Sequence, residues 1–338
     1  MTENLKRGPF REGDKVQLTG PKGRINTITL SAGAAFGTHR GDLKHDAIIG
    51  QPEGSIVQNQ NGVEYLAMRP LLTDFVLSMP RGAAIVYPKD AAQIIVEGDI
   101  YPGARVVEAG VGSGALSMYL LRAVGATGHL DSFERRAEFA EIAQANVATE
   151  LGHKPKNWKV HLGDLQVELP KKVKPGTADR VVLDMLAPWE CIETSADALI
   201  SGGLFIGYVA TVTQLSRLAE ALKASNRFAE PSAWESMVRP WHLQGLAVRP
   251  EHRMIGHTGF LITARKLADG TVLPEFKSRP AKTDFADEDV AVWNPEHLSA
   301  KKVGEKKLRK NLRNAINSAE ASAGRNQSDD DKQTTKLE

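Results

Sequence analysis

Cysteine is nearly absent from this 338-residue chain, and so are long apolar runs. The single cysteine, Cys191, excludes an internal disulfide framework and favours a reducing compartment. No stretch approaches the ~20 apolar residues of a membrane-spanning helix, and residues 1–11 are charged, unlike a secretory signal. The net charge of +2 gives no argument for a nucleic-acid partner. We therefore expect a cytoplasmic protein with no membrane partner.

The first 75 residues are rich in glycine and in short β-type runs. Turn signals such as Asn61-Gly62 separate these runs, which predicts a small antiparallel β domain over 1–75. The expected strands are Lys15–Leu18, Ile25–Leu30, Ser55–Val57 and Glu64–Pro70. Its basic residues fit either a substrate-docking module or a structural cap with a solvated face. They are Lys22, Arg24, His39, Arg40, Lys44 and His45.

From residue 76 to about 270, strand-like and helix-like segments alternate. Such alternation predicts a mostly parallel sheet with helices on both faces, so the expected fold class is α/β and Rossmann-like. The expected strands are Arg105–Glu108, His129–Phe133, Trp158–Leu162, Arg180–Asp184 and Gly203–Val209. The expected helices are Pro88–Val96, Ala115–Val124, Ala137–Leu151, Trp189–Leu199 and Gln214–Ser225. Two further strand-like segments, Ala233–Leu243 and Thr258–Arg265, predict an antiparallel C-terminal hairpin.

Residues 271–338 lose this periodicity. Pro274 and Pro280 break it, and a basic run, Lys301–Arg313, precedes a polar end, Asn326–Glu338. The basic run suits RNA phosphates. Such composition is more typical of a solvated, partly disordered tail, which we predict here.

A glycine loop follows the expected strand Arg105–Glu108. Gly110, Gly112 and Gly114 form a turn without side chains, and Ala115 opens a helix. A strand, a glycine loop and a helix N-terminus bring backbone N–H groups close to a nucleotide-like cofactor. The pattern fits NAD loosely, which leaves a dehydrogenase open. Glu108 favours S-adenosylmethionine (AdoMet), because a carboxylate there offsets the cationic methyl donor and repels a pyrophosphate.

Two more acids follow expected strands. Glu134 lies about twenty residues past the loop, where an acid accepts from ribose hydroxyls of either cofactor. Asp164 follows the next strand and can accept from an adenine amino group. The alternative for each is a surface acid that caps the following helix. Together with Glu108 they predict a nucleoside site at one edge of the sheet.

The stretch Val181–Trp189 gives the most specific motif. An apolar strand leads to Asp184, and the pattern Asp184-x-x-x-Pro188-Trp189 resembles the tRNA adenine-N1 methyltransferases that modify position 58 of the T-loop. The resemblance covers roughly residues 10–268. Further matching motifs are Arg81-Gly82, Tyr87–Asp90, Glu108–Leu116, Tyr208–Leu215 and Gly256–Leu261.

The resemblance implies a class I AdoMet-dependent methyltransferase that assembles as a homotetramer and acts on tRNA. It assigns Asp184 as the catalytic carboxylate and Tyr87 as an active-site aromatic. The positions that it implies for cofactor binding are Glu108, Gly110, Gly112, Ser113, Gly114, Ala115, Leu116, Glu134, Phe139, Asp164 and Asp184. Phe133 stands where the family often has tyrosine, which removes one hydroxyl.

The chemistry agrees with Asp184 in this role. As N1 of adenine attacks the methyl group, the base becomes cationic, and a carboxylate that accepts from N6 stabilises that charge. The base must leave the folded tRNA and enter a pocket. Tyr87 and Trp189 are candidates to line it, although Trp189 equally fits core packing.

Three readings compete with position-58 methylation. They are methylation of position 57 as well, a non-catalytic tRNA-binding subunit, and the dehydrogenase. Basic residues around the last strands suit tRNA phosphates: Arg239, Arg249, His252, Arg253 and His257. The two histidines have no carboxylate or cysteine at a ligand-like spacing, so we expect no metal.

Overall fold

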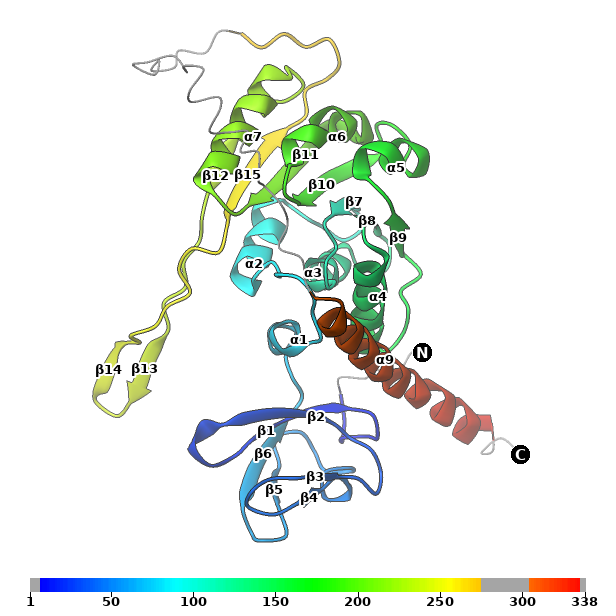
Figure 1. The fold of residues 1–338 in the computed structure, drawn as a ribbon, viewed down its shortest axis with the longest axis vertical. Coiled ribbons are helices and arrows are strands. Elements are labelled where there is room, and N and C mark those ends of the chain that lie inside the picture. The colour runs from blue at the N-terminus through cyan, green and yellow to red at the C-terminus, as the bar shows by residue number, and fades with distance from the viewer. Residues whose placement is uncertain (1–6, 275–303, 335–338) are drawn as a thin grey trace. The chain divides into compact units, whose positions relative to one another are not determined.

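The computed structural model describes residues 7–274 and 304–334. This part of the chain forms two compact units (Figure 1). The first contains the described residues up to Pro80, residues 144–155 and the described residues from Arg309. The second contains residues 81–143 and the described residues of 156–308. The domain limits at residues 75 and 270 remain predictions.

The first unit is built on an antiparallel sheet with strand order β2-β1-β6-β5. Its elements are β1 (Lys15–Thr19), η1 (Pro21–Gly23), β2 (Ile25–Thr29), β3 (Ala35–Phe36), β4 (Leu43–Lys44), η2 (His45–Ala47), β5 (Ile56–Gln58), β6 (Glu64–Met68) and α1 (Leu72–Ser78). Alternate residues of β1, Val16 and Leu18, are buried with Leu43 and Ala67. This alternation closes a small core of its own, which confirms the expected N-terminal β domain.

The second unit contains a seven-stranded sheet with the order β12-β15-β11-β10-β7-β8-β9. Strands β7 to β11 are parallel, whereas β15 runs antiparallel to both β11 and β12. The bounds are β7 (Arg105–Ala109), β8 (His129–Glu134), β9 (Trp158–Leu162), β10 (Ala178–Asp184), β11 (Leu199–Val209), β12 (Ser232–Trp234) and β15 (Phe260–Arg265). This mostly parallel α/β sheet confirms the predicted fold class.

Helices cover both faces of this sheet (Figure 1). They are α2 (Pro88–Glu97), α3 (Ala115–Val124), α4 (Ala137–Leu151), α5 (Leu165–Lys172), η3 (Pro188–Cys191), α6 (Ile192–Ala198) and α7 (Val212–Ala224). Val107 and Val181 pack against α5, α6 and α7 in one apolar cluster. Their neighbours Val106 and Val182 are equally buried on the opposite face, toward α2 and α3. Burial on both faces explains the continuous apolar runs of the central strands.

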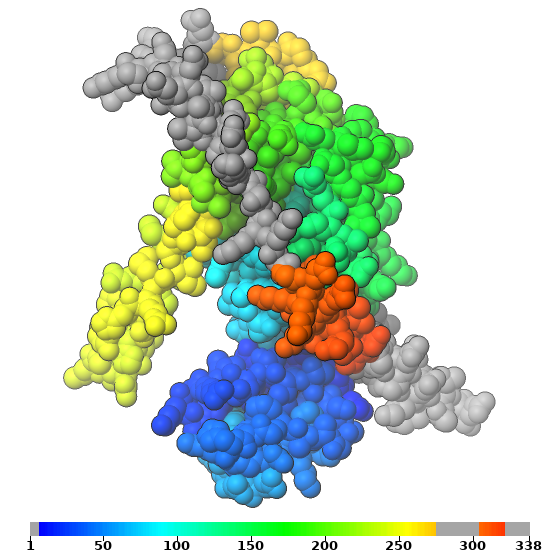
Figure 2. All heavy atoms as spheres, viewed as in Figure 1, coloured from blue at the N-terminus to red at the C-terminus, as the bar shows by residue number. Residues whose placement is uncertain are grey.

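One predicted strand is divided in the structure. The expected strand Ala233–Leu243 contributes only the short β12 to the sheet, and its remainder joins a separate hairpin of β13 (Trp241–Gln244) and β14 (Ala247–Pro250). Pro240 has no N–H for a ladder, and Gly245, with φ +54°, begins a two-residue turn. We call residues 237–256 the arm; it projects from the sheet as a slender extension (Figure 2).

Helices α1, α5 and α9 lie where none was expected. Helix α5 contains Pro170, which obscures its helical pattern, and its N-cap is Asp164. Helix α9 (Glu305–Thr334) lies inside the segment expected to be a disordered tail. Residues 301–303 of the basic run lie outside the described residues. No helix in the described ranges is long and apolar enough to cross a membrane.

Candidate active site

The candidate site lies at the carboxyl edge of the parallel strands. Strands β7, β8 and β10 end at Ala109, Glu134 and Asp184, and their parallel pairing brings these ends to one edge. The glycine loop follows β7 at this edge and leads into α3. The structure therefore brings together Glu134, Asp184 and the loop, as the sequence predicts for an open α/β sheet.

The glycine loop lies directly against the strand that carries Asp184. Gly110 has φ +88°, and a Cβ built on it would lie 1.7 Å from the backbone oxygen of Asp184. Gly114, the N-cap of α3, has φ +81° and lies against the backbone of Ala143. Only glycine satisfies both the conformation and the close approach at Gly110.

Glu134 is tied to the glycine loop. Its Oε2 accepts a hydrogen bond of 3.1 Å from the backbone N–H of Gly112. Its Oε1 accepts from the backbone N–H and from Nε of Arg136. Each oxygen of an ionised carboxylate has about two acceptor sites, so Oε2 keeps one for a ligand hydroxyl.

Glu108 is buried beneath the loop, with 1% of its surface exposed. Its Oε2 accepts from the hydroxyls of Ser117 (2.7 Å) and Ser132 (2.6 Å). Its Oε1 is buried and has no hydrogen-bond partner among the described residues. Burial raises the pKa of Glu108 to about 7, against the lowering effect of the two serines.

Asp184 ends β10 and is partly exposed. Desolvation of its carboxyl group by burial raises its pKa to about 7, and the nearby carboxylates of Glu108 and Glu134 raise it further. On β11 its partner in the sheet register is Tyr208. A carboxyl group with such a pKa at the carboxyl edge of a parallel sheet is typical of a functional residue.

Asp164 caps α5, the alternative that the sequence left open. Its Oδ1 accepts from the backbone N–H of Gln166, and its Oδ2 lies 3.5 Å from Nε of Arg135. Both roles leave acceptor sites on the carboxylate. Its contact with an adenine amino group remains a prediction.

The aromatic candidates have different surroundings. Tyr87 is half-buried at the N-cap of α2. Trp189 packs against the apolar cluster beside α6, and the guanidinium of Arg217 lies 4.1 Å from its ring centre. This packing supports the core interpretation of Trp189 over the pocket interpretation.

Phe139 is buried on α4, and the guanidinium of Arg136 lies 3.7 Å from its ring centre. A Cβ on Gly82 would lie 3.0 Å from the Phe139 ring and 2.9 Å from Cδ1 of Leu308. Leu308 belongs to the first turns of α9. No local pattern predicts this contact, because it joins residues more than 160 positions apart.

The basic residues expected to contact tRNA phosphates lie in the arm and at its base. Arg239, Arg249, His252 and Arg253 lie in the arm. At its base, His257 shares hydrogen bonds with the backbone oxygen of Ala210 and with Glu235, and these two partners raise its pKa. The described residues contain no group of three metal-ligating side chains.

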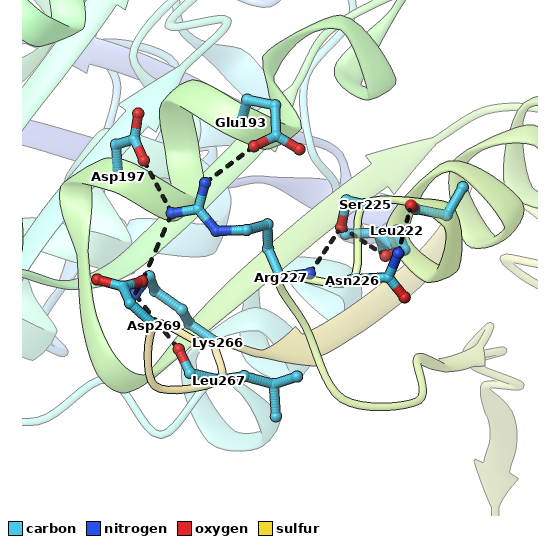
Figure 3. Close-up of polar contacts among 10 residues, drawn as sticks. Glu193, Asp197, Leu222, Ser225, Asn226, Arg227, Lys266, Leu267 and Asp269 are labelled. Atoms are coloured by element: carbon cyan, nitrogen blue, oxygen red, sulfur yellow. Dashed lines mark hydrogen bonds and ion pairs between the residues drawn. The ribbon is translucent and has the colours of Figure 1, made fainter. Parts of the chain in front are cut away.

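A charged cluster lies elsewhere in the second unit (Figure 3). Arg227 pairs with Glu193 (2.9 Å) and Asp197 (2.8 Å), and Lys266 pairs with Asp269 (2.9 Å). A cavity of about 240 Å³ adjoins it. Lys266 follows the end of the antiparallel β15, so the cluster lies toward the amino ends of the parallel strands, away from Asp184. We assign it a structural role.

Comparison with known proteins gives the family. The model "TrmI-like N-terminal" matches residues 8–57, and the model "tRNA methyltransferase complex GCD14 subunit" matches residues 63–245. A tRNA (adenine(58)-N(1))-methyltransferase of Thermus thermophilus is 33% identical over 72% of this chain and 94% of its own. The chain belongs to this family of tRNA methyltransferases.

Solved structures agree with this family assignment. The tRNA (m1A58) methyltransferase TrmI of Aquifex aeolicus has a TM-score of 0.68 and 28% identity, over 77% of this chain and all of that one. A SAM-dependent O-methyltransferase of Thermotoga maritima has a TM-score of 0.72 and 29% identity, over 78% of this chain and 96% of that one.

The residues at the edge fit the methyl donor that a methyltransferase family needs. The unpartnered Oε1 of Glu108 is a buried acceptor, and such an atom calls for a cationic or N–H-bearing group. The glycines leave backbone N–H groups accessible beside it, and Glu134 offers an acceptor for hydroxyls. These features fit AdoMet better than an anionic dinucleotide.

The sequence missed one polar cluster of this methyltransferase. Asp90 is completely buried and accepts hydrogen bonds from Tyr208 and Thr258. An acid in the first turn of an expected helix usually complements the helix dipole at the surface. Tyr208 and Thr258 each lie in a motif shared with the family, but the sequence does not show that their hydroxyls contact Asp90.

Proposed function

We propose that this chain transfers a methyl group from AdoMet to N1 of adenine 58 in tRNA. Membership in the tRNA methyltransferase family and the match along almost the whole of the Thermus relative support this proposal. The observation that carries it is the contact between Gly110 and the Asp184 backbone. This contact places the expected donor loop and the expected acceptor carboxylate side by side.

In this proposal, different residues bind different parts of AdoMet. The glycine loop, with Ser113, Ala115 and Leu116, forms the floor of the site at the start of α3. Glu134 accepts from ribose hydroxyls with the lone pairs that Gly112 and Arg136 leave. Glu108 provides negative charge below the loop. When bound, AdoMet supplies an electrophilic methyl group on a positively charged sulfur.

Asp184 holds the acceptor base in this proposal. Its carboxylate accepts a hydrogen bond from the exocyclic N6 amino group, which orients N1 toward the methyl group. N1 carries no proton, so Asp184 need not act as a base. Positive charge develops on the adenine during transfer, and a negative neighbour stabilises it most at the transition state.

Tyr87 provides an aromatic surface for the extruded base. The target adenine leaves the T-loop stack to reach the edge of the sheet, and unstacking costs a few kcal/mol. The half-buried ring at the start of α2 can recover part of that cost by stacking.

The direct test combines labelled AdoMet, unmodified tRNA and mapping of the modified base. We expect one methyl group per tRNA, on N1 of adenine 58, and a primer-extension stop at that position. A transcript with guanine at position 58 serves as the control. Label on that control tRNA, or label on no tRNA at all, would contradict the proposal.

Methylation of position 57 is the second candidate. A Methanocaldococcus jannaschii relative named for positions 57 and 58 is 32% identical over 68% of this chain and 87% of its own. The Thermus relatives are named for position 58 alone and match more of the chain, which favours the single position. A second primer-extension stop one nucleotide away would establish the dual specificity.

A non-catalytic subunit is disfavoured. The Dictyostelium discoideum relative, 26% identical, is named a catalytic subunit. This chain also has the complete glycine loop together with Asp184. Binding of AdoMet by calorimetry, with methyl transfer by the purified chain alone, separates the two readings.

We also propose that the chain is a homotetramer. The arm exposes Trp241, Leu243, Leu246 and Val248, with 55%, 74%, 104% and 57% of their surfaces accessible. A two-stranded hairpin is marginally stable alone in water. A second copy of the chain that covers these apolar side chains would supply the missing packing.

A further inference from the structure

The carboxylate of Asp90 on α2 accepts hydrogen bonds from four side chains. Its Oδ1 accepts from Nζ of Lys89 (2.6 Å) and Oγ of Ser236 (3.1 Å). Its Oδ2 accepts from the hydroxyls of Tyr208 (3.2 Å) and Thr258. An ionised carboxylate has about four acceptor sites, so this group is fully used.

These donors include both ends of the arm. Ser236 immediately precedes the arm, and Thr258 lies two residues after it. Lys89 also donates to the backbone oxygen of Ser236, over 2.7 Å. One carboxylate therefore fastens the outgoing and the returning chain of the arm to helix α2. The hydrogen bonds from Ser236 and Thr258 link positions 146 and 168 residues away from Asp90.

The same carboxylate holds Tyr208. Burial raises the pKa of the Tyr208 phenol, so its hydroxyl stays protonated and donates to Asp90. A Cβ on Gly259 would lie 2.4 Å from Cζ of Tyr208, so a larger residue there would displace the ring. Because Tyr208 is the register partner of Asp184, its ring is fixed next to the expected catalytic carboxylate.

A purely apolar cluster could hold these elements together without burying a charge. Buried ion pairs generally stabilise little relative to well-packed apolar groups. A fully satisfied buried network instead selects one arrangement of the parts that it joins. Here those parts are α2, the arm and the strand beside Asp184.

We infer that Asp90 is a positioning residue for methyl transfer, which fastens the base of the arm and the Tyr208 hydroxyl beside Asp184. This inference rests on the proposed function. The cluster then holds the arm, with its basic residues Arg239, Arg249 and Arg253, in one position relative to the carboxylate that receives the adenine. Loss of the cluster would loosen the arm and misplace the base, while the cofactor site, built on other strands, stays intact.

The test compares Thr258→Val with Thr258→Ser. Valine keeps the shape of threonine and loses the hydroxyl, whereas serine keeps the hydroxyl. We expect Thr258→Val to lower kcat/KM for tRNA by about 10- to 100-fold, the equivalent of one charge-assisted hydrogen bond. Thr258→Ser should stay within about threefold of the parent, and the AdoMet Kd of both variants should be unchanged.

Asp90→Asn extends the test. Asparagine would present an N–H₂ group to donors that need acceptors, so we expect a loss at least as large as that of Thr258→Val. The double variant should cost no more than Asp90→Asn alone, because both changes act through one cluster. If Asp90→Asn does not fold, the pair at Thr258 decides.

A second measurement, the rate of trypsin cleavage in the absence of tRNA, reports how firmly the arm is held. Arg239 and Arg249 precede prolines, so Arg253 is the arm arginine that trypsin cleaves readily. We expect faster cleavage after Arg253 in Thr258→Val than in Thr258→Ser. Equal cleavage and equal kcat/KM in the two variants would overturn the inference. A parent enzyme that methylates no tRNA would overturn the proposed function instead, and the cleavage rates would still test the cluster.

Discussion

Glu108 and Asp184 stand on the neighbouring parallel strands β7 and β10, and each has a pKa raised to about 7. Burial is the largest cause for both, and Glu108 contributes to the shift of Asp184. We therefore expect the proposed methyl transfer and the stability of the fold to depend on pH near neutrality. Two neighbouring acids also favour the binding of a cationic cofactor, as the proposed function requires.

Replacement of Asp184 tests the acceptor role directly. We expect Asp184→Ala and Asp184→Asn to lose about 10²- to 10³-fold in single-turnover methyl transfer, because the developing positive charge loses its partner. Calorimetry should show AdoMet affinity within a few-fold of the parent. Full activity of Asp184→Ala on tRNA would exclude the mechanism.

The raised pKa of Asp184 predicts a pH-dependent rate. The active form is the carboxylate, so kcat/KM should rise as the pH increases through about 7 and level off above it. In Glu108→Gln the neighbouring negative charge is gone, so the pKa of Asp184 falls and the rise moves to lower pH. An identical profile in both proteins would show that Glu108 does not act on Asp184.

Glu108 also predicts a pH-dependent stability of the cofactor-free protein. Its pKa is higher in the folded state than in the unfolded state, so its contribution is favourable at low pH and is lost as the pH rises from about 4.5 to about 7. The loss is on the order of 3 kcal/mol. Denaturant unfolding at pH 5 and pH 8 measures the free energy of unfolding of Glu108→Gln relative to that of the parent. This difference should favour Glu108→Gln more at pH 8 than at pH 5. For the exposed control Glu97→Gln, the difference should be the same at both pH values.

Two glycines of the loop should respond differently to alanine. At Gly110 a Cβ meets the Asp184 backbone, and both elements must shift, so we expect a loss of more than about 3 kcal/mol. At Gly112 the nearest atom is 3.8 Å away, and only the positive φ is strained, a cost of about 1–2 kcal/mol. Equal thermal stability of Gly110→Ala and Gly112→Ala would contradict this geometry.

The arm should control assembly. We expect the parent to have the mass of a tetramer in multi-angle light scattering, and Leu243→Ser/Leu246→Ser to shift it toward smaller species. Val272→Ser, which replaces an equally exposed apolar residue outside the arm, provides the control. An unchanged mass in the arm variant would remove the arm from the interface.

Local patterns explain what the sequence predicted well. The strand, glycine loop and helix around Gly110 depend on neighbours a few residues apart, and all three elements lie where expected. The end of β10 at Asp184 was predictable because an apolar run stops at an acid. Asp164 shows the limit of such reasoning. An acid at this position is expected both as the N-cap of a helix and as an acceptor for the adenine amino group, so the sequence cannot separate the two roles.

Long-range features escaped prediction for a common reason. The burial of Asp90 depends on hydroxyls that the chain returns to it more than a hundred residues later. The arm looked like part of a strand, because alternation cannot say which partner a strand will pair with. Pro170 concealed α5, and the contact of Leu308 with Phe139 and Gly82 has no local signature.

The reversed direction of β15 has an evolutionary consequence. Because β15 is antiparallel, the chain leaves β12 and re-enters β15 at the edge that carries Asp184, and Val238 pairs with Ile255 just beyond it. Residues added in pairs to the two sides of the arm would lengthen it without changing any register in the central sheet. The length of the arm can therefore diverge between related chains while the edge of the sheet at Asp184 stays constant.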